Sequence, residues 1–187
     1  MYNKYMIILV GPSASGKTEV AKKLVESFGF SKVVTYTSRP KRKGEKSGVD
    51  YHFITEESFL RKKDKDFFLE TTKYNGNYYG TSYNEIDINK VLIVDPNGLK
   101  AYRELHDNTI ISFYLLASEQ KRIDRMITRG DLKEDIVKRL ESDKVNFSYN
   151  KIGNIDFVID TENSSVRDIA QNIYEKYAKK LSEVGKL

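Results

Sequence analysis

Eight consecutive residues, Gly11–Thr18, constrain the fold of this chain more than any other part of the sequence. They read G-P-S-A-S-G-K-T and match the phosphate-loop pattern G-x-x-x-x-G-K-[ST] in full. An apolar strand is predicted directly before them, at Tyr5–Val10, and an amphipathic helix over Gly16–Phe28. A phosphate loop needs this order of strand, loop and helix, so the pattern predicts a site for a nucleoside triphosphate.

Each residue type in the loop has a physical task. Gly11 and Gly16 permit the backbone angles that bring N–H groups close to phosphate oxygens, and the following helix adds its N-terminal dipole. We expect Lys17 to reach the β- and γ-phosphates and the Thr18 hydroxyl to ligate Mg²⁺. The predicted nucleotide-binding set is the whole loop: Gly11, Pro12, Ser13, Ala14, Ser15, Gly16, Lys17 and Thr18.

The remaining sequence alternates strand-like and helix-like segments, which is typical of a parallel sheet with crossover helices. We therefore expect an α/β fold of the phosphate-loop NTPase type, with a five-stranded parallel core sheet flanked by helices. The final helix has a capping-box spacing at Ser165 and Asp168. The other predicted strands are Lys32–Tyr36, Lys90–Asp95, Thr109–Ala117 and Phe157–Asp160.

Two stretches interrupt this alternation. Thr37–Ile88 is rich in turns, Tyr and charge, with a hairpin signal at Asn75-Gly76, and Arg129–Asp135 is a short charged connection. Both follow strands at the edge of the sheet where ligands bind in α/β folds. We expect one domain over 1–187, divided into a core (1–36, 89–127 and 144–187), a small α+β insert (37–88) and a short lid (128–143).

Composition narrows the classes of protein further. The chain has 187 residues, 39% of them hydrophobic, which suits a single folded domain. It has no apolar run long enough for a membrane helix and no secretory signal, and it contains no Cys, so we expect a cytoplasmic protein without a membrane partner. The net charge of +5 includes one basic cluster, at Arg39–Lys46, which a nucleotide explains as well as a nucleic acid does.

A second group of polar residues suits an acceptor nucleotide. Arg39 and Arg42 are spaced to grip a phosphate, and Tyr51 and Tyr79 carry hydroxyls that donate hydrogen bonds. Glu70 suits a base that presents a ring N–H beside an exocyclic amine, which guanine does and adenine does not. From the residues alone, the arginines are equally well interpreted as solvated charges and the tyrosines as part of a hairpin.

The order of these residues resembles the guanylate kinase family. From Thr35 the chain reads T-Y-T-S-R-P-K-R-K-G-E-K-S-G-V-D-Y-H-F, and from Glu70 it reads E-T-T-K-Y-N-G-N-Y-Y-G-T. The resemblance covers nearly the whole chain and implies Mg²⁺-dependent transfer of a phosphoryl group from ATP to GMP and dGMP, with no nucleic-acid partner, in a monomer or homodimer. By position it implies that GMP is bound by Thr35, Arg39, Arg42, Tyr51, Glu70, Tyr79, Thr81 and Asp95.

Basic residues of the predicted lid complete the set. A helix over Ser118–Arg129 places Arg122, Arg125 and Arg129 on one face, and Arg139 follows on the next helix. The resemblance implies that Lys17, Arg125, Arg129 and Arg139 are catalytic, because positive charge around the transferring group accelerates phosphoryl transfer. Arg122 fits better as part of a solvent-exposed helix with surface salt bridges.

The chain departs from the family pattern near Asp95. The family commonly reads L-D-x-D-x-Q-G, whereas Ile93 here replaces the first acidic residue and Asn97 replaces Gln. Besides the base-reading role that the resemblance implies, Asp95 is a candidate second Mg²⁺ ligand beside Thr18. Its structural alternative is to cap the helix that Pro96 begins. Two other functions stay open: a catalytically weak protein-interaction module of the guanylate kinase type, and a kinase for another nucleoside monophosphate. The intact phosphate loop and lid arginines argue against the first.

Overall fold

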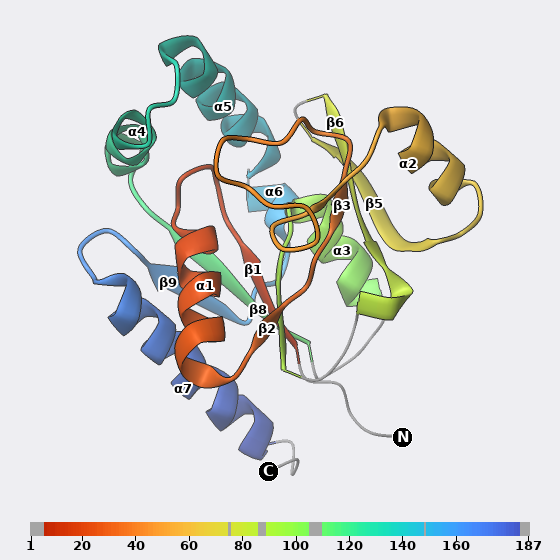
Figure 1. The fold of residues 1–187 in the computed structure, drawn as a ribbon. Coiled ribbons are helices and arrows are strands. Elements are labelled where there is room, and N and C mark those ends of the chain that lie inside the picture. The colour runs from red at the N-terminus through yellow and green to blue at the C-terminus, as the bar shows by residue number, and fades with distance from the viewer. Residues whose placement is uncertain (1–5, 75, 86–88, 105–109, 148, 184–187) are drawn as a thin grey trace.

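A five-stranded parallel sheet forms the centre of the computed structural model, in the order β2-β7-β1-β8-β9 (Figure 1). The structure describes residues 6–74, 76–85, 89–104, 110–147 and 149–183, so the predicted strand starts at Tyr5 and Thr109 lie outside these ranges. The predicted α/β core is confirmed. Its strands are β1 Met6–Val10, β2 Ser31–Lys32, β7 Lys90–Ile93, β8 Ile110–Leu116 and β9 Phe157–Asp160.

Helices cover both faces of this sheet, which explains why every residue of β1 is buried. On one face, Ile7 and Leu9 pack with α1 (Lys17–Phe28) and α7 (Val166–Glu183). On the other face, Met6 and Ile8 pack with Leu99 and Tyr102 of α3 (Pro96–Glu104). The two apolar layers fix the strand order and therefore the edge at which the loops after β1 and β7 meet.

The predicted insert contains a second sheet of four strands, in the order β4-β3-β6-β5, and helix α2 (Glu56–Lys63). Its strands are β3 Tyr36–Thr37, β4 His52–Phe53, β5 Phe68–Tyr74 and β6 Asn77–Ser82, followed by the short helix η1, Tyr83–Glu85. Strands β5 and β6 form an antiparallel hairpin in which Tyr74 lies opposite Asn77. The predicted hairpin is confirmed, with Gly76 at a φ of +78° and Asn75 outside the described residues.

The predicted strand over Lys32–Tyr36 is wrong as a single element. Lys32 pairs with Val91 in the central sheet, whereas Tyr36 pairs with Gly80 in the second sheet, so the chain passes from one sheet to the other between them. The β-branched run looks like one strand because local sequence reports strand preference and not the partner strand. Thr35 lies at the crossing, 8% exposed.

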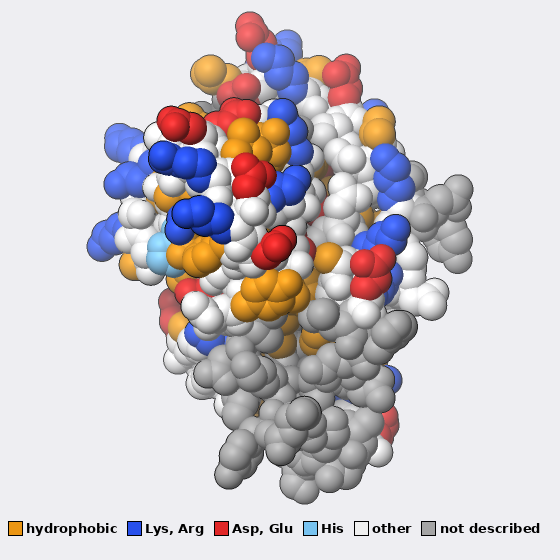
Figure 2. All heavy atoms as spheres, turned by 90° about the vertical axis from the view of Figure 1, so that its right-hand side faces the viewer, with side chains coloured by type: hydrophobic (Ala, Val, Ile, Leu, Met, Phe, Trp, Pro, Cys, Tyr) orange, Lys and Arg blue, Asp and Glu red, His pale blue; other side chains and the backbone are white. Residues whose placement is uncertain are grey.

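Helices α4 (Glu119–Thr128) and α5 (Lys133–Asn146) lie at the upper left of Figure 1, and the predicted lid (128–143) covers their short connection and most of α5. The four-residue helix α6 (Tyr149–Ile152) follows. Within the described ranges, no helix has the length and apolar character needed to cross a bilayer. The face that carries α2 shows Lys and Arg side chains interspersed with Asp and Glu (Figure 2).

Candidate active site

One cavity of about 200 Å³ is bordered by the phosphate loop, the insert and the lid. Its lining brings together most of the predicted site residues, which come from segments far apart in the chain. Those that line it are Gly11, Ser13, Ala14, Lys17, Thr18, Thr35, Arg39, Arg42, Tyr51, Glu70, Tyr79, Asp95, Arg129 and Arg139. Pro12, Ser15, Gly16, Thr81 and Arg125 are not among the lining residues.

The phosphate loop has its shape because two positions accept only glycine. A Cβ on Gly11 would lie 2.4 Å from the carbonyl oxygen of Leu115, too close for any side chain. Gly16 has a φ of +99° and directly precedes α1. The loop therefore curls back from β1 and leads straight into the helix, so the N-terminus of α1 faces the cavity's phosphate-loop side.

Lys17 is held at this loop by its own backbone. Its Nζ donates to the carbonyl oxygens of Gly11 and Pro12, at 2.6 and 2.8 Å. Burial lowers the pKa of Lys17 to about 8, because a desolvated ammonium is less stable than one in water. A cation in this environment is stabilised by an anionic ligand, which is what a phosphate loop binds.

Arg125 does not line the cavity but contacts the backbone of the phosphate loop. Its guanidinium donates to the carbonyl oxygen of Ala14 at 3.1 Å and to that of Thr161 at 2.5 Å. The Thr161 hydroxyl in turn donates to the Ser15 carbonyl oxygen at 3.0 Å. Sequence reasoning missed Thr161, although its position directly after β9, at the carboxyl edge of the sheet, was a usable signal.

The insert arginines are organised by a residue that was not singled out in the sequence. Glu45 accepts from Arg39 Nη2 and from the backbone N–H of Arg42, both at 2.7 Å. The Arg39 guanidinium also lies 5.4 Å from the centroid of the Tyr51 ring. Burial, and then the charges of Arg39 and Arg139, lower the pKa of Arg42. An anion bound here would relieve that repulsion.

Glu70 and Thr81 form a buried pair across the β5–β6 hairpin. The Thr81 hydroxyl donates to Glu70 Oε1 at 2.8 Å. Thr81 is fully buried behind Glu70, whereas Glu70 lines the cavity. Burial, with a contribution from the charge of Asp95, raises the pKa of Glu70 to about 7. Thr81 therefore orients a carboxylate that is ready to accept hydrogen bonds from a ligand.

Asp95 has both carboxylate oxygens occupied by neighbours. Oδ1 accepts the backbone N–H of Gly98 at 2.8 Å. This bond confirms the predicted role of Asp95 as the cap of α3. Oδ2 accepts the Thr72 hydroxyl at 2.9 Å. Thr72 was also missed, although it lies two residues after Glu70 and therefore on the same face of β5.

Arg122 contradicts its predicted place on a solvent-exposed surface. It is only 7% exposed and forms an ion pair with Asp143 of α5, with 2.7 Å between Nη1 and Oδ2. Helices α4 and α5 contact each other, and Arg122 Nη1 also donates to the carbonyl oxygen of Ser13 at 3.4 Å, so the arginine face of α4 points partly into the protein. Charge spacing within one helix does not reveal a partner on another helix, which is why the sequence misled. Arg129 and Arg139, which line the cavity, both pair with Asp131.

The chain's own residues offer few metal ligands. Among the described residues there is no group of three His, Cys, Asp or Glu side chains that could hold a metal ion. Thr18 lines the cavity, and Ile93 lines it where the family pattern has a carboxylate. This donor set fits Mg²⁺ only as an ion that keeps water and phosphate oxygens as most of its ligands.

Comparisons with known proteins agree on one family. The family model described as "Guanylate kinase" matches residues 3–179. A guanylate kinase of Thermotoga maritima is 34% identical over 168 residues, covering 84% of this chain and 79% of that protein. The crystal structure of guanylate kinase from Anaplasma phagocytophilum superposes with a TM-score of 0.73 at 27% identity, covering 96% of this chain and 88% of the other.

A shikimate kinase from Acinetobacter baumannii shares the fold, with a TM-score of 0.52 at 14% identity, covering 95% of each chain. The family model spans nearly the whole chain, and the same stretch contains the phosphate loop, the second sheet and helices α4 and α5. This chain therefore belongs to the guanylate kinase family, the ATP:GMP phosphotransferases among the nucleoside monophosphate kinases.

Proposed function

We propose that this chain transfers the γ-phosphoryl group of ATP to GMP, and to dGMP, giving ADP and the corresponding diphosphate. One observation carries the proposal: a single cavity is lined by Lys17 of the phosphate loop and by Glu70 of the insert, with Arg129 and Arg139 also on its wall. A triphosphate bound at Lys17 and a guanine bound at Glu70 would place the γ-phosphate of ATP next to the phosphate of GMP, between these two residues.

The donor is ATP, held by the backbone of Gly11–Thr18. Lys17 turns from the loop carbonyls to the β- and γ-phosphates. The negative charge of these phosphates stabilises the ammonium, which burial destabilises. Mg²⁺ neutralises charge on those phosphates when bound, with Thr18 as its protein ligand. Asp95 is a weaker candidate ligand because both of its oxygens already accept hydrogen bonds.

The acceptor is GMP, held by the insert. Arg39 and Arg42 pair with its phosphate, and Tyr51 and Tyr79 donate hydroxyl hydrogen bonds to it. Burial raises the pKa of Tyr51 to about 12, so this phenol keeps its proton as a donor. The family resemblance and their place on the cavity wall support these roles.

Guanine is selected by Glu70. Its carboxylate accepts from the ring N–H and the exocyclic amine of guanine, whereas adenine presents no such pair of donors, so a buried Glu70 would be left without partners. Thr35 and Asp95, which also line the cavity, complete the base site, and Thr81 acts through Glu70.

The transfer is a direct in-line displacement without a covalent intermediate. The acceptor phosphate oxygen attacks the γ-phosphorus while the bond to the β-phosphate oxygen breaks, and Lys17, Arg129 and Arg139 stabilise the spreading negative charge. Arg125 contributes by holding the backbone of the phosphate loop. We propose that the insert (37–88) and the lid (128–143) close over the core (1–36, 89–127 and 144–187) and exclude water.

An assay of ADP formation over a panel of nucleoside monophosphates tests the proposal. We expect turnover with GMP and dGMP, and none above background with AMP, CMP or UMP. Activity with AMP or a pyrimidine but not GMP would refute the role of Glu70. No ADP with any acceptor would favour the alternative of a catalytically weak interaction module.

A further inference from the structure

Asp143 is a buried carboxylate on α5 that the proposed reaction does not use. It is 3% exposed, and it accepts hydrogen bonds from residues on three other elements. The donors are Ser13, through its backbone N–H at 2.9 Å and its hydroxyl at 3.2 Å, the Tyr74 hydroxyl at 2.9 Å and Arg122 Nη1 at 2.7 Å. We call these four residues the Asp143 cluster.

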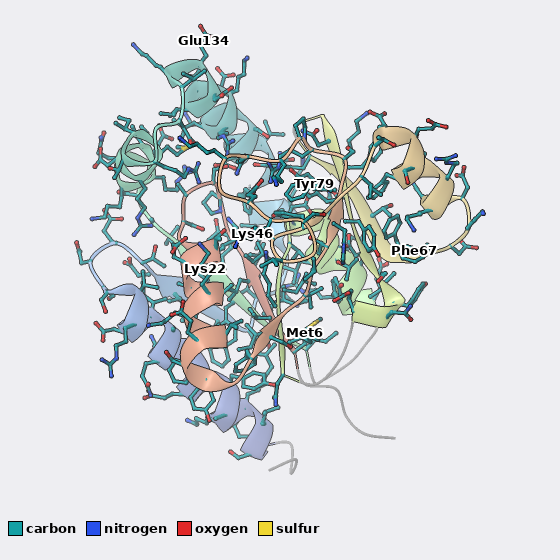
Figure 3. All side chains as sticks on the ribbon, viewed as in Figure 1. Met6, Lys22, Lys46, Phe67, Tyr79 and Glu134 are labelled. Atoms are coloured by element: carbon teal, nitrogen blue, oxygen red, sulfur yellow. The ribbon has the colours of Figure 1, made fainter. Side chains whose placement is uncertain are left out.

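The Asp143 cluster joins all three parts of the active site. Ser13 belongs to the phosphate loop and Tyr74 ends strand β5 of the predicted insert. Asp143 lies on α5, within the predicted lid, and Arg122 lies on α4, within the predicted core. Ser13 and Tyr74 also line the cavity. In Figure 3, Glu134 marks the outer end of α5 at the top of the molecule, and Tyr79 marks strand β6 of the insert nearer its centre. One carboxylate therefore contacts the phosphate loop, strand β5 of the insert and helix α4.

A buried ion pair is a poor source of stability, because apolar residues of similar volume serve as well in a protein interior. Its cost is offset only when its hydrogen bonds are made, and an ion pair then selects one arrangement of the parts over others. The bonds of Asp143 to Ser13 and Arg122 hold α5 against the phosphate loop. The hydrogen bond from the Tyr74 hydroxyl connects Asp143 to the insert.

We propose that Asp143 is a positioning residue that couples the insert to the phosphate loop, with Tyr74 as the link. Glu70, Thr72 and Tyr74 alternate along β5 and all line the cavity, so they share one face of the strand. Docking of Tyr74 on Asp143 fixes that face, and with it Glu70, opposite the phosphate loop. The kinetic consequence rests on the proposed function, whereas the structural coupling does not.

Tyr74→Phe isolates this link because it removes the hydroxyl and leaves the ring and the Arg122–Asp143 pair. The chain contains no Cys, so two introduced cysteines carry spin labels at unique positions. Glu57 on α2 and Glu134 on α5 are exposed and belong to the insert and the lid. The matched control is Lys144→Ala, which removes an exposed ion pair between Lys144 of α5 and Glu119 of α4, 3.6 Å apart.

We expect electron–electron distance measurements without nucleotide to give one narrow distribution in the parent and in Lys144→Ala. Tyr74→Phe should broaden it and shift it to longer distances. The same distribution in parent and Tyr74→Phe, or equal broadening in both variants, overturns the proposal. Asp143→Asn should broaden it as well, because the amide replaces one acceptor oxygen with a donor; a parent-like distribution in that variant also overturns it.

Steady-state kinetics give a second readout, because a general loss of rigidity in the protein would affect both substrates and not GMP alone. Tyr74→Phe should raise the KM for GMP by about tenfold, the scale of one hydrogen bond to a charged group, with kcat and the KM for ATP within about twofold. An equal rise in both KM values contradicts the coupling. If the parent shows no activity with GMP, the proposed function fails, and the distance measurement still decides the coupling.

Discussion

The proposed donor and acceptor halves of the cavity are built differently. The donor half is eight consecutive residues between β1 and α1, and its shape follows from the backbone at Gly11 and Gly16. The acceptor half draws side chains from β5, β6, the loop before β4 and the loop after β7. A site made from one loop is formed wherever its strand and helix form, whereas a site made from several elements exists only when they are packed together.

The two halves also differ in how their charges are managed. Lys17 is a single buried ammonium that donates to backbone carbonyls. Arg39 pairs with Glu45 through its guanidinium, whereas Arg42 contacts the same carboxylate through its backbone N–H, and the charges of the two arginines repel each other. The donor half is thus pre-organised by neutral dipoles and the acceptor half by a balance of full charges. Changes in the donor half should therefore damage turnover with every acceptor, and changes in the acceptor half should damage the use of one nucleotide.

The largest expected effect is in the donor half. Lys17→Ala should lower kcat by about a thousandfold with GMP at saturation, because the charge on the transferring group loses its nearest fixed cation. ADP formation measures the loss. The control is Lys22→Ala, which removes an exposed lysine of the same helix, paired with Glu19. A loss below about tenfold in Lys17→Ala would contradict its assigned role.

The next effect should be confined to the acceptor half. Glu70→Ala should lower kcat/KM for GMP by about a hundredfold, the scale of two lost hydrogen bonds to a carboxylate, and leave ATP affinity unchanged. Calorimetric titration with ATP and steady-state kinetics with GMP separate the two halves. Glu56→Ala, an exposed acid on α2 of the same insert, is the control. Unchanged GMP kinetics in Glu70→Ala would refute the base-reading assignment.

The use of GMP should depend on pH through Glu70. Burial raises the pKa of Glu70 from 4.5 to about 7. Between these two pH values Glu70 is therefore protonated in the folded chain and ionised in the unfolded chain. Rising pH therefore lowers Glu70's contribution to the free energy of unfolding across this range, and it supplies the carboxylate that guanine needs. We expect kcat/KM for GMP to rise about tenfold between roughly pH 6 and pH 8.

The profile of Glu70→Gln isolates this titration, since the phosphate of GMP also changes its charge near neutral pH. The variant should retain only the shallower dependence due to the nucleotide. A parent profile with the same shape as that of Glu70→Gln would show that Glu70 is ionised throughout.

The smallest effect should come from the charge balance around the arginines. Glu45→Gln should raise the KM for GMP by about fivefold, because Arg39 and the backbone of Arg42 lose a charged partner that fixes the loop. The exposed pair of Glu57 and Arg61, 3.7 Å apart in the same insert, provides the control Glu57→Gln. Equal effects of the two substitutions would show that Glu45 does not organise the site.

The sequence predicted best the features that depend on neighbours in the chain. The loop at Gly11–Thr18, the helix after it and the β5–β6 hairpin were found because glycine placement and apolar periodicity act over a few residues. The run at Lys32–Tyr36 was misread because strand preference does not say which sheet a residue joins. Thr72 and Glu45 were missed although they lie beside predicted residues, because only packing shows which hydroxyl or carboxylate meets a given partner.

By itself, the sequence determined that this protein has a phosphate loop between a buried strand and a helix, and that residues suited to GMP follow it. Only the tertiary structure decided that Arg122 is buried against Asp143 and that Asp143 meets Ser13, which lies 130 positions away. The physical reason is the distance along the chain over which each interaction acts. Backbone conformation is set by a residue and its neighbours, whereas a buried charge is stabilised by donors that arrive from other elements when the core packs.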